Sequence, residues 1–357
     1  MATCDVCSKP DSKSRCSSCK IYYYCSSECS KIHWGQGHKQ QCKMIVDSQK
    51  QMNKKNEETD MLITKLKSID NDQCCICMDD LSIANAFILP CNHFLCNKCI
   101  FELPGKGIYE DDELVCEEPP SCPICRADMP KISDLFQYLY EMAALFLQRA
   151  YELPLGSIER LDVCTIAKNQ IEKIYSFFRE DPSLKSPQLT LYLRILEAKI
   201  SLYEGNASQG IEMASRLLEE QDLQPQFQVE QLINIGDCYI LLEQFEKALN
   251  SYCKAMKFCD NSMAKENRTI FHQLTRCFYE IKDYDNALNF GNAAIEMNRH
   301  YDGVYKYVAL SYKASGNLDK AIETMKQAVL YETPWNQNNI MKVKSFLLEL
   351  EEEKMNR

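Results

Sequence analysis

Long apolar segments are missing from this sequence. No stretch reaches the roughly 20 apolar residues that a helix needs to cross a bilayer. The most apolar segment, residues 135–151, is interrupted by Gln137, Glu141, Gln148 and Arg149, which is typical of a buried helix in a soluble protein. We therefore expect no membrane partner.

A basic excess and a secretion signal are missing as well. The formal net charge is −10, whereas a general nucleic-acid binder is usually basic, so we expect no nucleic-acid partner. The first ten residues, MATCDVCSKP, contain no apolar signal-peptide core. This favours a reducing compartment, either the cytoplasm or the nucleus.

Cysteine, in contrast, is abundant in the first part of the chain. All but five of the 21 cysteines precede residue 126, and most stand in Cys-x2-Cys or Cys-x3-Cys pairs. In an oxidising compartment such pairs could form a disulfide framework. Histidines at ligand spacing beside the pairs favour zinc thiolates instead.

Residues 74–125 contain four metal-ligand pairs. In chain order these are Cys74/Cys77, Cys91/His93, Cys96/Cys99 and Cys122/Cys125. A Cys-x2-Cys turn places two sulfurs on one side of a metal, which is half of a tetrahedral zinc shell. Four pairs make two closed shells and leave no position for a catalytic water. The predicted zinc ions are therefore structural.

This order and spacing of ligands over residues 74–130 resemble the RING finger. RING fingers interleave their pairs, so the resemblance implies that alternate pairs share a metal. One zinc ion would be bound by Cys74, Cys77, Cys96 and Cys99, and the other by Cys91, His93, Cys122 and Cys125. The spare cysteines Cys75 and Cys116 are alternative ligands, but Cys74 keeps the two-residue spacing to Cys77.

RING fingers typically recruit a ubiquitin-conjugating enzyme charged with ubiquitin. The resemblance implies that Ile76, Pro123 and Ile124 dock that enzyme, and that Arg126 is the cation that contacts both the enzyme and ubiquitin. The alternative is that Ile76 and Pro123 only pack the zinc turns.

Residues 1–45 contain another set of four pairs. These are Cys4/Cys7, Cys16/Cys19, Cys25/Cys29 and His38/Cys42. With the aromatic run 22–24 before Cys25, and Trp34 ahead of His38, they resemble the MYND finger. A segment this short cannot bury enough apolar area to fold alone, so zinc binding must supply much of its folding free energy.

The resemblance to MYND fingers again implies interleaved pairs. One zinc ion would be bound by Cys4, Cys7, Cys25 and Cys29, and the other by Cys16, Cys19, His38 and Cys42. The spacing from Trp34 to His38 is one residue longer than is usual, which makes His33 the alternative ligand.

MYND fingers usually bind short proline-containing peptides. Tyr23, Tyr24 and Trp34 could line such a peptide groove, or they could form the small core between the zinc ions. Residues 46–73 are rich in Lys, Gln, Asn and Glu, and this composition predicts a linker that ends in a short helix. The acidic stretch between Ile100 and Ser121 predicts a solvated loop.

Helical periodicity begins after residue 131. Residues 131–186 form a predicted connector with helices at 133–152 and 158–179 around a turn at 154–156, and residues 187–336 show self-similarity near the 34-residue period of tetratricopeptide (TPR) repeats. In the clearest repeat, small residues let paired helices approach closely and aromatic residues fill the remaining gaps. The residues at its repeat positions are Leu232, Gly236, Tyr239, Ala248, Tyr252 and Ala255. Residues 337–357 are predicted to form a capping helix.

The resemblance to TPR arrays implies a binding scaffold, because such arrays hold peptides or extended segments on their concave face. Some hold a carboxylate at the end of a partner chain with Lys, Asn and Arg. Asn234 and Arg276 stand where such residues could lie, but the Lys–Asn pair expected in the first repeat is missing.

We therefore predict a multidomain protein, in which two zinc-stabilised fingers precede an all-α TPR-like solenoid. The predicted function is that of a RING-type ubiquitin-protein ligase, with ubiquitin and a conjugating enzyme as partners and with protein or peptide ligands at the MYND finger and the TPR groove. The alternative is a non-catalytic zinc-binding adaptor. SMYD-type lysine methyltransferases also join MYND and TPR-like parts, but residues 46–130 leave no room for their SET domain.

Overall fold

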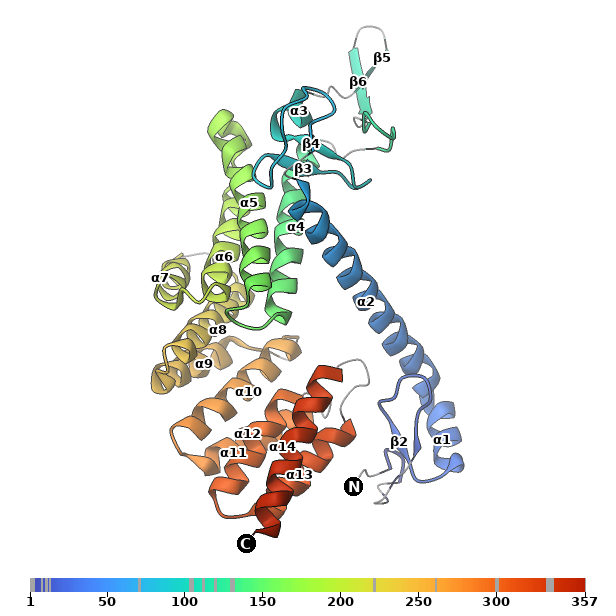
Figure 1. Ribbon diagram of the computed structural model, residues 1–357, viewed down its shortest axis with the longest axis vertical. Coiled ribbons are helices and arrows are strands. Elements are labelled where there is room, and N and C mark those ends of the chain that lie inside the picture. The colour runs from blue at the N-terminus through green and yellow to red at the C-terminus, as the bar shows by residue number, and fades with distance from the viewer. Residues whose placement is uncertain are drawn as a thin grey trace. The chain divides into compact units, whose positions relative to one another are not determined.

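The computed structural model describes residues 4–7, 9, 12, 14–69, 72–102, 106–110, 113–118, 121–128, 132–220, 223–260, 262–298, 302–331 and 337–356. The chain divides into two compact units. The first contains Met1–Met52 and Leu218–Arg357, and the second contains Asn53–Leu217. Each unit combines a cysteine-rich module with a set of helices (Figure 1).

The N-terminal module of the first unit is a short hairpin followed by helical turns. Strand β1 (Ser14–Arg15) pairs antiparallel with β2 (Tyr23–Tyr24). Helix α1 (Ser27–His33) is capped at its N-terminus by Ser26, whose hydroxyl accepts a 3.3 Å hydrogen bond from the Cys29 N–H. In the π-helical turn η1 (Trp34–His38), Gly37 adopts a φ of 113°, a conformation that favours glycine and turns the chain into the next helix.

Helix α2 (Lys39–Lys67) continues without interruption for 29 residues. It is much longer than the short helix predicted at the end of residues 46–73, where apolar positions are sparse. The segment 39–67 contains neither Gly nor Pro and is rich in Lys and Gln, which are good helix formers. Its last turns, within the second unit, bury Ile63 and Leu66.

The second cysteine-rich module (residues 74–128) is built around a hairpin of three-residue strands. Strand β3 (Ala86–Ile88) pairs antiparallel with β4 (Phe94–Cys96), and α3 (Asn97–Glu102) follows. Strands β5 (Lys106–Glu110) and β6 (Glu113–Glu118) form a second hairpin, where the sequence predicted a solvated loop. The prediction missed these strands because their strand-favouring residues, Ile108, Tyr109, Leu114 and Val115, stand among acidic residues.

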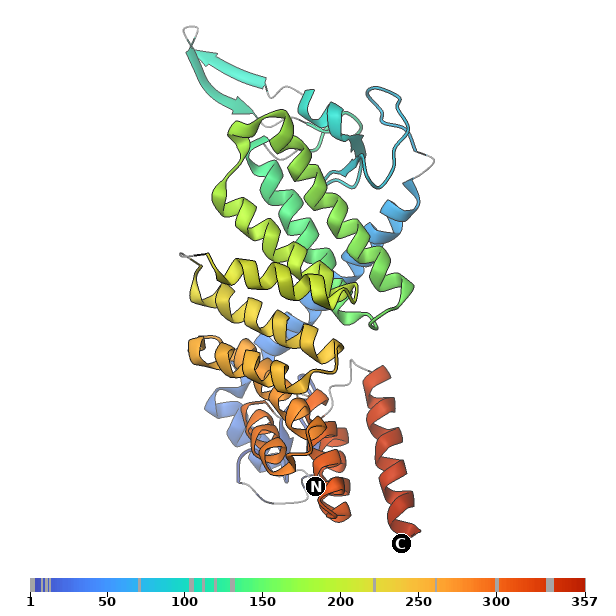
Figure 2. The ribbon, with the colours of Figure 1, turned by 90° about the vertical axis from the view of Figure 1, so that its left-hand side faces the viewer.

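The remaining helices of the second unit follow this module along the chain. They are α4 (Ile132–Glu152), α5 (Ile158–Glu180), α6 (Pro187–Tyr203) and α7 (Ala207–Leu218), with a short 3₁₀ turn η3 (Pro182–Leu184) before α6. Helices α4 and α5 lie side by side in both views (Figures 1 and 2). One continuous apolar core joins them to the β3–β4 hairpin through residues such as Phe87, Leu95, Leu139 and Phe146.

The C-terminal helices of the first unit form successive antiparallel pairs. The pairs are α8 (Pro225–Leu241) with α9 (Phe245–Phe258), α10 (Ala264–Glu280) with α11 (Tyr284–Met297), and α12 (Asp302–Ala314) with α13 (Leu318–Tyr331), followed by α14 (Gln337–Met355). Gly236 allows the first pair to close, because a Cβ there would lie 2.5 Å from Cζ of Tyr252. Within the described residues, no helix is long and apolar enough to cross a membrane.

Candidate metal centres

Sixteen cysteine and histidine side chains gather into four groups of four. In each group the potential ligand atoms all lie within 4.8 Å of one another. The groups are Cys4/Cys7/Cys25/Cys29, Cys16/Cys19/His38/Cys42, Cys74/Cys77/Cys96/Cys99 and Cys91/His93/Cys122/Cys125. In both modules the first pair along the chain therefore joins the third pair, and the second joins the fourth.

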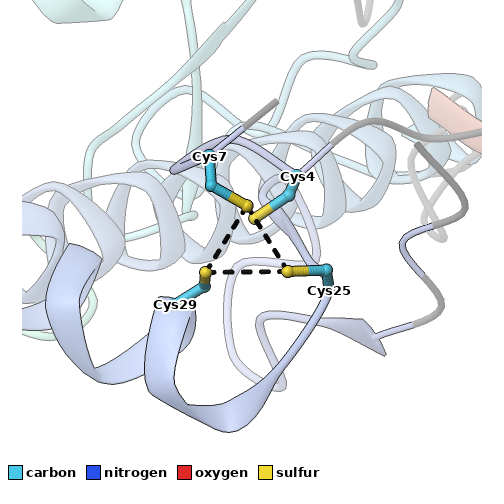
Figure 3. A group of neighbouring side chains, drawn as sticks. All are labelled: Cys4, Cys7, Cys25 and Cys29. Carbon is cyan, nitrogen blue, oxygen red and sulfur yellow. Dashed lines mark hydrogen bonds between the residues drawn. The ribbon is translucent and has the colours of Figure 1, made fainter. Parts of the chain in front are cut away.

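The first group lies between the N-terminal loop and α1 (Figure 3). The sulfur of Cys7 lies 3.5 Å from that of Cys25 and 3.7 Å from that of Cys29, and the Cys25 and Cys29 sulfurs are 3.6 Å apart. Sulfurs bound tetrahedrally at about 2.3 Å from one zinc ion would be about 3.8 Å apart. The geometry of the group is therefore compatible with zinc.

The second group is fully buried beside the β1–β2 hairpin. The Cys16 and Cys42 sulfurs are 3.7 Å apart, and Nε2 of His38 lies 3.8 Å from the Cys19 sulfur. Burial lowers the pKa of His38, and this favours the neutral imidazole that metal binding requires. His33 stacks on His38 with a ring-centroid distance of 4.7 Å and lies outside the group, so the ligand position is occupied by His38.

The two groups of the second module share the β3–β4 hairpin. In one group the Cys77 and Cys96 sulfurs are 3.6 Å apart, and the Cys96 N–H points to the Cys74 sulfur at 3.4 Å. In the other, Nδ1 of His93 lies 3.5 Å from the Cys91 sulfur and 3.6 Å from the Cys122 sulfur. His93 thus presents Nδ1 where His38 presents Nε2. Cys75 is exposed and lies outside both groups.

Ionisation of all the thiols in one group requires a bound cation. Burial opposes ionisation of Cys74, but backbone N–H groups of Cys96, Cys77 and Ile76 outweigh it and lower the pKa of the Cys74 thiol to about 6. In the neighbouring group, burial raises the pKa of Cys91 to about 11. Clustered thiols cannot all ionise beside one another without a positive charge between them. A zinc ion supplies that charge, and four ligands leave no open coordination position, so the groups are compatible with structural zinc.

The first and last Cys-x2-Cys turns of the second module have the same backbone geometry. The residue after the second cysteine donates its N–H to the carbonyl of the first, from Met78 to Cys74 at 2.8 Å and from Arg126 to Cys122 at 2.8 Å. Met78 and Arg126 both have left-handed backbones, with φ of 64° and 59°. The two turns are thus structural equivalents.

These two turns expose apolar side chains to solvent. Ile76 is 42% exposed and Ile124 is 51% exposed, while Pro123 and Arg126 are also exposed. Met78 is 63% exposed and was not singled out from the sequence. Its equivalence to Arg126, one residue after a ligand pair, is the signal that could have identified it.

The aromatic residues of the N-terminal module have different environments. Tyr24 is 2% exposed and packs with Cys16, Cys19 and Cys42, so it belongs to the small core. Tyr23 is also 2% exposed and contacts the ring of Tyr331, with a centroid distance of 5.6 Å. Trp34 alone among the three candidates for a peptide groove is largely exposed, at 43%.

The candidate carboxylate-binding residues of the helical repeats are engaged within the protein. Asn234 is buried and its amide donates to Gln231 at 3.4 Å. The Arg276 guanidinium lies 5.9 Å from the ring centroid of Tyr307. This arrangement leaves Asn234 inaccessible to a carboxylate on a partner.

Two known families account for parts of the chain. Residues 4–42 match the MYND finger, and residues 232–261 and 308–332 match the tetratricopeptide repeat. The chain therefore carries a MYND finger followed by a helical TPR-like solenoid. Both kinds of module are protein-interaction modules.

Similarity to curated proteins is restricted to segments. The chain is 56% identical to ubiquitin C-terminal hydrolase 15 of Oryza sativa subsp. japonica over 39 residues, which are 11% of this chain and 4% of the rice protein. It is 50% identical to ubiquitin carboxyl-terminal hydrolase 17 of Arabidopsis thaliana over 40 residues, 11% of this chain and 5% of that protein. It is 28% identical to the BBSome complex member BBS4 of Bos taurus over 138 residues, 39% of this chain and 25% of the bovine protein. The matches span at most a quarter of these relatives.

Solved structures resemble the helical part. BtubC from P. vanneervenii is 17% identical with a TM-score of 0.39, and the match covers 55% of this chain and 90% of BtubC. YrrB, described as a TPR protein with an unusual peptide-binding site, is 15% identical with a TM-score of 0.37, covering 57% of this chain and 99% of YrrB.

Proposed function

We propose that this protein is a RING-type ubiquitin-protein ligase. The second cysteine-rich module would dock a conjugating enzyme charged with ubiquitin, while the MYND finger and the TPR-like helices recruit protein substrates. The proposal is supported by the ligand order over residues 74–125 and by the way those ligands cluster. It places the activity in a reducing compartment, the cytoplasm or the nucleus.

The observation that carries the proposal is the pair of equivalent turns. With zinc bound, each group of four ligands would hold one turn rigidly, and each turn presents an exposed isoleucine, Ile76 or Ile124. A small exposed apolar surface on a rigid support is what a partner protein can bury. Pro123 adds a fixed backbone angle beside Ile124.

The module would act without a nucleophile of its own. Zinc would be held by the eight ligands of this module and would supply structural rigidity. Ile76, Pro123 and Ile124 bind the conjugating enzyme, and the exposed guanidinium of Arg126 donates hydrogen bonds to that enzyme and to ubiquitin. Holding the thioester in the geometry that a substrate lysine attacks is catalysis by positioning.

Ubiquitin transfer by the full chain tests this function. The zinc-loaded protein is mixed with activating enzyme, a panel of conjugating enzymes, ubiquitin and ATP, beside the variants Ile76→Ala and Arg126→Ala. Matched controls are Ile158→Ala, with a side chain that is 76% exposed in the same unit, and Arg179→Ala on exposed α5 surface. We expect ladders from the wild type and both controls, and a loss of about tenfold or more in the two test variants.

A non-catalytic adaptor is the second candidate, and one observation favours it. The parts of the chain that match known families, residues 4–42 and residues 232–261 and 308–332, belong to two kinds of interaction module. An adaptor would give no ladder with any conjugating enzyme while it still bound a partner through these modules. The exposed Arg126 beside an apolar turn favours the ligase.

A further inference from the structure

The outer edge of strand β3 carries carbonyl groups that β4 cannot reach. The Asn97 N–H donates to the Asn85 carbonyl at 2.8 Å, and the Leu89 N–H donates to the His93 carbonyl at 2.8 Å. Residues 85, 87 and 89 therefore face β4, since alternate residues of a strand point their carbonyls to opposite sides. The carbonyls of Ala86 and Ile88 are left on the other side.

Two helices supply donors to these two carbonyls. The Tyr138 hydroxyl on α4 donates to the Ile88 carbonyl at 3.0 Å. Nζ of Lys173 on α5 donates to the Ala86 carbonyl and lies 3.3 Å from Oε1 of Gln170. Successive outward carbonyls of a strand edge are thus each satisfied by a different helix.

These contacts lie within an apolar core rather than on a surface. Lys173 is 2% exposed, and Ala86, Phe87, Ile88 and Leu89 are at most 3% exposed. A buried carbonyl without a donor costs free energy, and so does a buried amine N–H without an acceptor. The Lys173–Ala86 contact satisfies both groups, and the Phe87 and Tyr138 rings, with centroids 5.8 Å apart, close the core beside it.

The strand held in this way belongs to the hairpin that serves both metal groups of the module. Cys91 and His93 lie in its turn and belong to one group, whereas Cys96 ends β4 and belongs to the other. Ala86 is the register partner of Cys96. The position of β3 therefore sets ligands of both groups, and each group holds one of the two equivalent turns.

We propose that Tyr138 and Lys173 are positioning residues of the docking module, so that the α4–α5 hairpin is an integral part of it. They fix the β3–β4 hairpin, and the hairpin fixes the turns that carry Ile76 and Ile124 through the two metal groups. The consequence for a conjugating enzyme rests on the proposed function, whereas the mechanical coupling can be measured without it. The functional module therefore extends well beyond residues 74–130.

Hydrogen exchange in the full, zinc-loaded chain measures the coupling directly. The variants are Lys173→Met and Tyr138→Phe. Tyr138→Phe removes only one hydroxyl, so we expect this variant to fold even if Lys173→Met does not. The controls are Lys168→Met on the exposed face of α5 and Tyr151→Phe, with a side chain that is 65% exposed, on α4. With four zinc ions retained, we expect amide exchange in residues 85–97 and in both turns to accelerate about 2- to 12-fold in Tyr138→Phe, the factor for one lost hydrogen bond.

Two outcomes would overturn the proposal. One is unchanged exchange in residues 85–97 of Tyr138→Phe and of any folded Lys173→Met protein. The other is acceleration in the hairpin with unchanged exchange at residues 74–78 and 122–126, because the turns would then be independent of the helices.

Ubiquitin transfer by the same proteins separates this proposal from the proposed function. Positioning predicts that Tyr138→Phe raises KM for the charged conjugating enzyme several-fold and changes kcat less than twofold. An unchanged KM would contradict the positioning role. An inactive wild type would overturn the ligase function, and the exchange result would still decide the coupling.

Discussion

Arg126 occupies in the last turn of the second cysteine-rich module the position that Met78 occupies in the first. Each donates its N–H to the first cysteine of its turn at 2.8 Å, and each has a left-handed backbone. The two turns are held by different metal groups, which share the β3–β4 hairpin. The exposed side chains of the two turns are a thioether, two isoleucines and a guanidinium, those of Met78, Ile76, Ile124 and Arg126.

The equivalence assigns a role to Met78 in partner binding. We predict that Met78→Ala weakens binding of a conjugating enzyme about fivefold, because a side chain that is 63% exposed would be buried by the partner. Isothermal titration with the conjugating enzyme that gives the strongest ladder measures the loss. The control Met341→Ala, with a side chain that is 68% exposed on α14, should bind like the wild type, and equal losses in both variants would refute the role.

The number of bound zinc ions should fall when a single ligand is removed. Cys25→Ala removes one of the four sulfurs of its group, so we predict that the variant holds three zinc ions instead of four. Native mass spectrometry counts the ions. Cys253→Ala, on α9 outside all four groups, should hold four. Four ions in Cys25→Ala would contradict the ligand assignment.

The free energy of unfolding should depend on pH through the titration of Lys173. Burial lowers the pKa of this lysine from its ordinary 10.5 to about 7, so between these values the unfolded chain binds the proton and the folded chain releases it. The contribution of Lys173 to the free energy of unfolding therefore increases from pH 7 toward 10.5, by up to about 1.4 kcal/mol per pH unit.

The variant Lys173→Met removes this titration. We expect urea unfolding between pH 7 and 9 to show that the free energy of unfolding of the wild type, relative to that of the variant, increases as the pH rises. The control Lys168→Met should track the wild type at every pH. A difference that stays constant for Lys173→Met would show that the lysine is not titrating in this range.

Close packing of α8 against α9 should be sensitive to one methyl group. A Cβ at residue 236 would meet the Tyr252 ring at 2.5 Å, so Gly236→Ala must displace that ring. We predict a loss of about 1–3 kcal/mol in the free energy of unfolding. Thermal unfolding followed by circular dichroism reports it, and Lys254→Ala on the exposed side of α9 should change stability little. A neutral Gly236→Ala would contradict the packing described here.

Local sequence patterns were sufficient to predict the features that depend only on residues close together in the chain. The Cys-x2-Cys pairs and the helices at 132–152 and 158–180 follow from spacing and periodicity. Which pairs share a metal depends on the β3–β4 hairpin, and only the family resemblance suggested it. Helix α2 was underestimated because its stability in residues 46–60 comes from propensity rather than from an apolar face.

Contacts between residues far apart in the chain could not be predicted from the sequence. Lys173 reads as an ordinary surface lysine on a helix, and its acceptor lies 87 residues earlier in the chain. Similarly, Tyr23 and Trp34 could not be distinguished as groove or core residues until their burial, 2% against 43%, was seen. Long-range packing decides such cases, and local pattern does not encode it.

The most direct test of the ligase function is single-turnover discharge of ubiquitin from a charged conjugating enzyme onto free lysine, with and without the full zinc-loaded chain. We predict that the wild type accelerates discharge with at least one conjugating enzyme, that Ile158→Ala does the same, and that Ile76→Ala and Arg126→Ala do so about tenfold less. No acceleration by the wild type with any conjugating enzyme in the panel would contradict the ligase function and leave the adaptor.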